Sequence, residues 1–94
     1  MEVIVEFSWR EAGGILRKGK GRSRDVSDVG AFVLASACPP VGAVVNYKLY
    51  LSGDPGTKLA RVEERVAKVV RVERPEEVRG VGRSGFAVFG ESRR

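Results

Sequence analysis

Apolar side chains alternate with polar ones along most of this chain, and a period of two residues is typical of half-buried β-strands. Residues 2–9 show the pattern most clearly, with Val3, Val5, Phe7 and Trp9 in the apolar set. That set would face a core, and the residues between would mostly face water. The alternation therefore predicts an all-β fold in which Trp9 packs inside and is not exposed for base stacking.

The same period recurs in segments that are separated by turn residues. Further strands are predicted over residues 15–24, 31–35, 45–51 and 84–89. Tyr47 and Phe86 fall at core positions of their strands. Gly13 and Gly14 predict a hairpin turn after the first strand, because glycine tolerates positive φ.

Residues 59–73 fit two secondary structures. Their mixed charges would tolerate a helix, but the segment also holds five valines. β-Branched residues are enriched in strands, and Val66 to Val72 mostly alternate with charged residues. We therefore predict one long strand with a bulge, and a helix is the alternative.

These segments add up to a small all-β domain. Five or six antiparallel strands in 94 residues, with little or no helix, predict one domain built as a small six-stranded antiparallel β-barrel. Its core would span about residues 3–89, and residues 90–94 would form a flexible tail.

Composition excludes several kinds of functional site. It has no histidine and a single cysteine, Cys38. We therefore expect no internal disulfide, no metal site, no cofactor and no enzyme activity. No apolar run approaches the roughly 20 residues that span a bilayer, and the acidic N-terminus is unlike a signal peptide. A cytoplasmic protein without membrane insertion is expected, and its net charge of +5 favours acidic partners.

A hexapeptide at residues 25–30, DVSDVG, closes the basic strand and opens an apolar one. As a plain turn, it would use Asp25 and Ser27 to hydrogen-bond local backbone and Gly30 to supply a positive φ. As a nucleotide site, the Asp25 carboxylate would accept from guanine N–H groups and the Ser27 hydroxyl would donate or accept. Gly30 would let the backbone approach a flat base. Both interpretations remain open at this point.

The hexapeptide, placed between two predicted strands, resembles the signature of the PilZ family, and the later strands follow in the order that this family shows. The resemblance spans about residues 3–89. It implies a six-stranded barrel that binds cyclic di-GMP, a bacterial dinucleotide second messenger, and that acts on a partner protein.

The family's second motif, Arg-x-x-x-Arg, lies just before the first strand, where this sequence has only Met1 and Glu2. We expect either a native start upstream of Met1 or a divergent member of the family. The same spacing occurs at Arg61/Arg65 and at residues 79–83, but both follow the hexapeptide. The family role is therefore not transferred to them.

A basic strip precedes the hexapeptide. Lys18, Lys20, Arg22 and Arg24 share one face of their predicted strand and lead directly to Asp25. Arg22 and Arg24 are therefore predicted to bind the ligand together with Asp25, Ser27 and Gly30. The alternative is a solvated strand face that discourages edge-to-edge aggregation.

Three functions follow, in this order of preference. The first is a cyclic di-GMP-binding receptor or adaptor module. The second is a PilZ-like domain that does not bind the nucleotide and acts through protein contacts alone. The third is a small basic barrel that binds nucleic acid, which ranks last because aromatic residues are only 7% of the chain and mostly fall at core positions.

Overall fold

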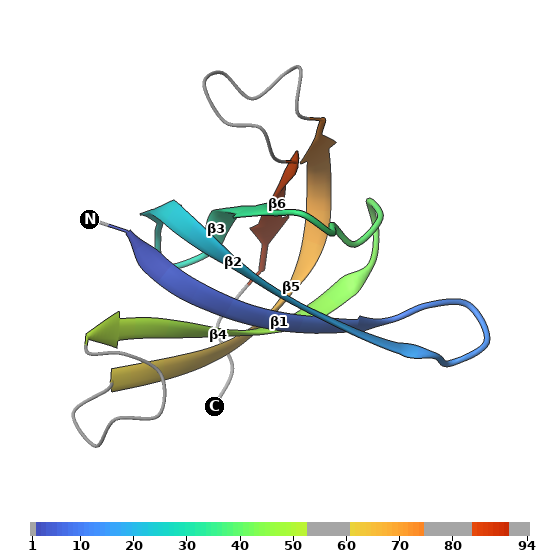
Figure 1. Cartoon of the computed structure of the whole chain (residues 1–94), viewed down its shortest axis with the longest axis horizontal. Helices are drawn as coiled ribbons and strands as arrows, with labels where there is room; N and C mark the ends of the chain where they lie inside the picture. The colour runs from blue at the N-terminus through green and yellow to red at the C-terminus, as the bar shows by residue number, and fades with distance from the viewer. Residues whose placement is uncertain (1, 53–60, 75–83, 91–94) are drawn as a thin grey trace.

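The computed structural model describes residues 2–52, 61–74 and 84–90, and within them the chain forms strands and connecting turns without a helix. The strands are β1 (Val3–Arg10), β2 (Leu16–Val26), β3 (Gly30–Ala35), β4 (Val44–Ser52), β5 (Arg61–Glu73) and β6 (Ser84–Phe89). They close into a barrel in the order β1-β2-β3-β6-β5-β4 (Figure 1). Every neighbouring pair is antiparallel, so the predicted six-stranded barrel is confirmed. Among these residues no helix is long and apolar enough to cross a membrane.

Alternate side chains of the strands fill the barrel. Trp9, Tyr47 and Phe86 are buried, as predicted. The Phe7 ring lies at the centre of an aromatic group, stacked on Trp9 with 5.8 Å between centroids and packed edge-on against Phe86 at 4.9 Å. The other buried apolar side chains of this core are Val3, Val5, Ala31, Val33, Ala35, Val45, Leu49, Ala67, Val69 and Val88.

The β1–β2 hairpin turns at the paired glycines, as predicted. Gly13 and Gly14 have φ values of 87° and 83°, a region that side-chain-bearing residues rarely adopt. The Arg10 guanidinium donates a hydrogen bond of 2.8 Å to the Gly14 carbonyl oxygen across the turn. In Figure 1 this hairpin projects well beyond the rest of the barrel.

The ambiguous segment is a strand, and the helical alternative is wrong. β5 runs from Arg61 to Glu73 and pairs with β4 on one side and β6 on the other. Its register against β6 shifts between Val69 and Arg71, which is the predicted bulge. Residues 59 and 60 lie outside the described part of the chain, as do residues 79–83 with the second Arg-x-x-x-Arg spacing and residues 91–94 of the predicted tail.

β2 ends two residues later than predicted, at Val26 instead of Arg24. Its register against β3 shifts between Arg22 and Asp25. Beyond this shift Asp25 and Val26 still pair with β3, so the first two residues of the hexapeptide belong to the barrel wall. Only Ser27, Asp28 and Val29 form the turn, and Gly30 begins β3.

Candidate ligand-binding site

The β2–β3 turn is closed by its own polar groups. The Ser27 amide donates to the Gly30 carbonyl oxygen at 2.9 Å, and the Ser27 hydroxyl accepts from the Val29 amide at 3.3 Å. The predicted local role of Ser27 is therefore confirmed. Asp25 does not follow the prediction of a backbone hydrogen bond, because within the described residues its exposed carboxylate has no hydrogen bond or ion pair. Ser27 thus shapes the turn, and Asp25 is left available.

Gly30 is not the positive-φ residue that the sequence predicted. In the described part of the chain only Gly13, Gly14 and Gly42 have positive φ. Gly30 is the first residue of β3, it is buried, and a Cβ atom there would collide with the Val88 carbonyl oxygen of β6. Glycine is required here because β3 and β6 approach closely. The structure therefore explains Gly30 by the packing of two strands and not by the approach of a base.

Arg65 of β5 fastens the turn from inside the barrel. Its side chain is only 7% exposed, and its Nη1 donates to the Ser27 carbonyl oxygen at 2.5 Å while its Nε pairs with Glu63 at 3.0 Å. Burial by itself lowers the pKa of this guanidinium, but Glu63 and the neighbouring Tyr47 hydroxyl outweigh burial, so the pKa is raised and the group stays charged. The Tyr47 hydroxyl is also buried, and no group among the described residues forms a hydrogen bond of good geometry with it.

Sequence reasoning missed the role of Arg65, although a signal existed. Arg65 has the same strand parity as Ala67 and Val69, which are both core residues, so alternation places it inside. A buried arginine needs acceptors, and only the three-dimensional pairing of strands shows that the hexapeptide turn supplies one.

The basic strip is exposed as predicted, but most of it is paired. Arg22 and Arg24 both contact the Glu2 carboxylate, at 3.2 and 3.3 Å, and Lys20 lies 3.9 Å from Glu6. The hydrogen bond from Arg24 is the main cause that holds the pKa of Glu2 below its ordinary value, burial opposes it, and Arg22 adds to the lowering. Exposed pairs of this kind contribute little free energy, so a phosphate could displace Glu2.

A shallow groove of about 450 Å³ opens beside Asp25 on the outside of the barrel. Its walls are mostly apolar: Val29, Val70 and Phe89 are 41%, 53% and 60% exposed, and Phe32 is half-buried. Asp25 pairs with Phe32 across β2 and β3, so the two side chains share this outer face. A mostly apolar groove with one carboxylate at its end suits a flat ring that carries hydrogen-bond donors on one edge.

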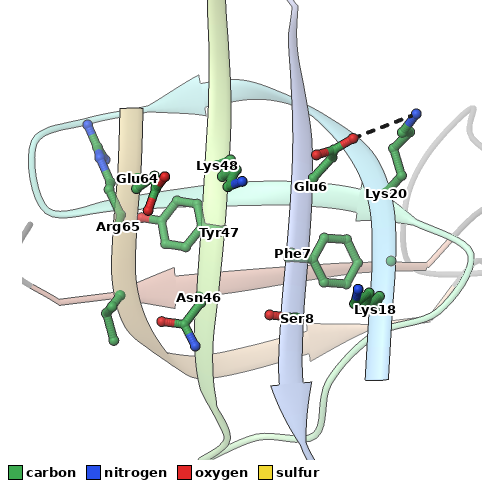
Figure 2. Close-up of a pocket in the computed structure, with 12 residues that line it drawn as sticks. Glu6, Phe7, Ser8, Lys18, Lys20, Asn46, Tyr47, Lys48, Glu64 and Arg65 are labelled. Carbon is green, nitrogen blue, oxygen red and sulfur yellow. Dashed lines mark ion pairs between the residues drawn. The ribbon is translucent and has the colours of Figure 1, made fainter. Parts of the chain in front are cut away.

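A second groove, of about 730 Å³, lies across the outer face of β2, β1, β4 and β5 (Figure 2). Lys20, Glu6, Lys48 and Glu64 form one cross-strand row in it, and their charges alternate. The aromatic residues next to this row in sequence are buried in the core, so they offer no exposed ring to a base. The groove is also lined by Lys18 and the buried Arg65, so its lining is net positive, but it offers no exposed aromatic ring. It therefore gives little support to the nucleic-acid alternative, which needs stacking platforms as well as positive charge.

The described residues offer neither a metal site nor an activated nucleophile. No three His, Cys, Asp or Glu side chains among them gather closely enough to hold a metal ion. Cys38 is a free, half-buried thiol, and burial raises its pKa, which disfavours the thiolate.

Comparison with protein-family models, with curated proteins and with solved structures finds no match to this chain. What the chain does must therefore follow from its own residues. Of the predicted ligand-binding residues, Asp25 is exposed at the groove, Ser27 closes the turn, Gly30 begins β3 beyond it, and Arg22 and Arg24 lie on the strand that leads to it.

Proposed function

We propose that this chain is a PilZ-type receptor module that binds cyclic di-GMP at the groove beside Asp25. One observation carries the proposal: the Asp25 carboxylate is exposed and has no partner among the described residues, at the end of an apolar groove. The turn next to it is fixed to β5 by Arg65, so the groove is pre-organised for a ligand.

Each residue of the site has a task in this proposal. The Asp25 carboxylate accepts hydrogen bonds from guanine N–H groups, since an ionised carboxylate is an acceptor only. Ser27 closes the turn and is bonded to Arg65 of β5, and Gly30 lets β3 approach β6 closely. Arg22 and Arg24 release Glu2 and turn to a phosphate, which an arginine fork binds well.

The bound nucleotide would also change the surface that a partner protein meets. Without it, the groove exposes Val29, Val70 and Phe89 beside Asp25. With it, these apolar walls are covered and the negative charge of the nucleotide is added to this surface. Such a change suits an adaptor in cytoplasmic signalling, and a reduced cytoplasm suits the free Cys38.

Isothermal titration calorimetry of the chain with cyclic di-GMP, at micromolar protein and low salt, tests the proposal. Asp25→Asn should weaken binding roughly 10- to 100-fold, because a hydrogen bond to a charged group contributes about 1.5–3 kcal/mol. Asp28→Asn is the matched control, since Asp28 is exposed in the same turn and its replacement changes the net charge equally. Absence of binding by the unaltered chain, or equal effects of both replacements, would reject the site.

A second function, protein binding without the nucleotide, is favoured by the exposed Val29, Val70 and Phe89. A contiguous apolar surface of this kind is typical of interaction sites. Affinity capture from cell extract separates the two functions. If protein contacts act alone, Asp25→Ala and Arg22→Ala should retain the captured partner, and Phe89→Ser should lose it.

A further inference from the structure

Asp25 is one end of a row of four side chains that crosses the outside of the barrel. Asp25 pairs with Phe32, Phe32 pairs with Ala87, and Ala87 pairs with Arg71. Neighbouring strands are about 4.8 Å apart, so the row of Asp25, Phe32, Ala87 and Arg71 spans about 14 Å between its end Cα atoms. We call this set the Asp25–Arg71 row.

A bulge in β2 places Asp25 in this row. Arg22 pairs with Leu34, so an uninterrupted antiparallel ladder would set Arg24 opposite Phe32. The register shift sets Asp25 there instead. The bulge therefore replaces a cation beside the Phe32 ring with a carboxylate.

A second bulge, in β5, places Arg71 at the other end. Val69 pairs with Val88, so an uninterrupted ladder would set Val70 opposite Ala87. The register shift sets Arg71 there instead. Bulges often re-aim side chains next to functional sites, and here two of them, on separate strands, bring opposite charges into one row.

The Arg71 side chain reaches back along the row toward Asp25. Its guanidinium carbon lies 5.7 Å from the centroid of the Phe32 ring, in a cation–π contact. Between β3 and β5 lie Ala87 and Gly85 of β6, and the Phe32 ring lies over Gly85, where a Cβ atom would collide with it. The Arg71 Nε pairs with Glu73 at 2.8 Å, yet the side chain remains 60% exposed. The carboxylate and the guanidinium thus flank one aromatic ring on the same face.

We propose that Arg71 binds the phosphate of the nucleotide whose guanine is held by Asp25, with the base lying along the Phe32–Ala87 surface. This inference rests on the proposed function and adds a phosphate-binding residue that lies outside the hexapeptide and the basic strip. The orientation follows from charge, because Asp25 repels a phosphate and Arg71 attracts it.

The row also selects the base. Guanine presents N–H donors on the edge that an acceptor-only carboxylate can bind, including an exocyclic amino group that adenine lacks there. Adenine would turn a ring-nitrogen lone pair toward the carboxylate. The ligand class is therefore a guanine nucleotide with an accessible phosphate, and cyclic di-AMP should bind at least tenfold more weakly than cyclic di-GMP.

Calorimetry with Arg71→Gln tests the inference, and Arg61→Gln is its matched control. Both arginines are exposed residues of β5, and both replacements remove one positive charge. We expect Arg71→Gln to weaken cyclic di-GMP binding tenfold or more and Arg61→Gln to change it less than twofold. Arg71→Lys keeps the charge without the fork and should fall between Arg71→Gln and the unaltered chain. Melting temperatures of all three variants check that the fold is intact.

The outcomes separate the inference from the proposed function. If the unaltered chain binds and Arg71→Gln binds equally well, the role of Arg71 is wrong while the Asp25 site stands. If cyclic di-AMP binds as tightly as cyclic di-GMP, recognition of guanine by the carboxylate is wrong. If the unaltered chain does not bind cyclic di-GMP, the proposed function is wrong and the role of Arg71 with it.

Discussion

Replacing Gly30 with alanine should destabilise the barrel although the new side chain is a single methyl group. The added Cβ would collide with the Val88 carbonyl oxygen of β6, to which β3 is paired. Overpacking of a core costs about 1–3 kcal/mol, and a backbone oxygen in a strand ladder cannot rotate away, so the upper end applies. Lower entropy of the unfolded alanine chain offsets about 0.4–1 kcal/mol. The net loss is about 2 kcal/mol, or a melting temperature lower by roughly 8–16 °C.

Urea unfolding followed by the fluorescence of Trp9, the only tryptophan and a buried one, measures this loss. Gly14 provides the contrast, because a Cβ there meets nothing within 4 Å but φ is 83°. Gly14→Ala should therefore cost about 1 kcal/mol through backbone strain, and Gly14→Asn should recover much of it. Gly30→Asn should recover nothing. A Gly30→Ala chain within about 0.5 kcal/mol of the original, the range of neutral surface changes, would refute this account of the hexapeptide glycine.

Three further predictions concern Arg65, Ala87 and Cys38. Arg65→Met removes the buried hydrogen bond to the Ser27 carbonyl and should lower the unfolding free energy by about 2 kcal/mol. Arg61→Met should change it by less than about 0.5 kcal/mol. Equal effects of the two replacements in urea unfolding would contradict the stabilising role of Arg65. Ala87→Leu places a bulky side chain between Phe32 and Arg71 and should weaken cyclic di-GMP binding several-fold by calorimetry; unchanged affinity would contradict the proposed role of the Asp25–Arg71 row. Burial raises the pKa of Cys38, so less thiolate is present at any given pH. A disulfide reagent at pH 8 should therefore react more slowly with the folded chain than with the chain in urea. Equal rates would contradict the burial of this thiol.

Most of the fold could be predicted because it depends on local patterns. Alternation alone identifies β1 and its buried face, and paired glycines identify the first hairpin. β-Branched composition correctly favours a strand for β5. The closing contacts of β1 with β4 and of β3 with β6 join distant segments, and no local pattern names those partners.

The candidate site was less predictable because it depends on registers. A one-residue shift exchanges the two faces of a strand, so the sequence alone cannot tell whether Arg24 or Asp25 lies beside Phe32. The same holds for Val70 and Arg71. The prediction that Gly30 has positive φ failed for a related reason, since its need for glycine comes from β6, a strand far away in the sequence.

An amide NMR titration of the ¹⁵N-labelled chain with cyclic di-GMP distinguishes the Asp25 groove from other surfaces, because it reports where the ligand binds as well as whether it does. The largest chemical-shift changes should fall on the Asp25–Arg71 row and the adjoining turn. Changes centred on the groove of Figure 2, or no changes at millimolar nucleotide, would contradict binding at the Asp25 groove.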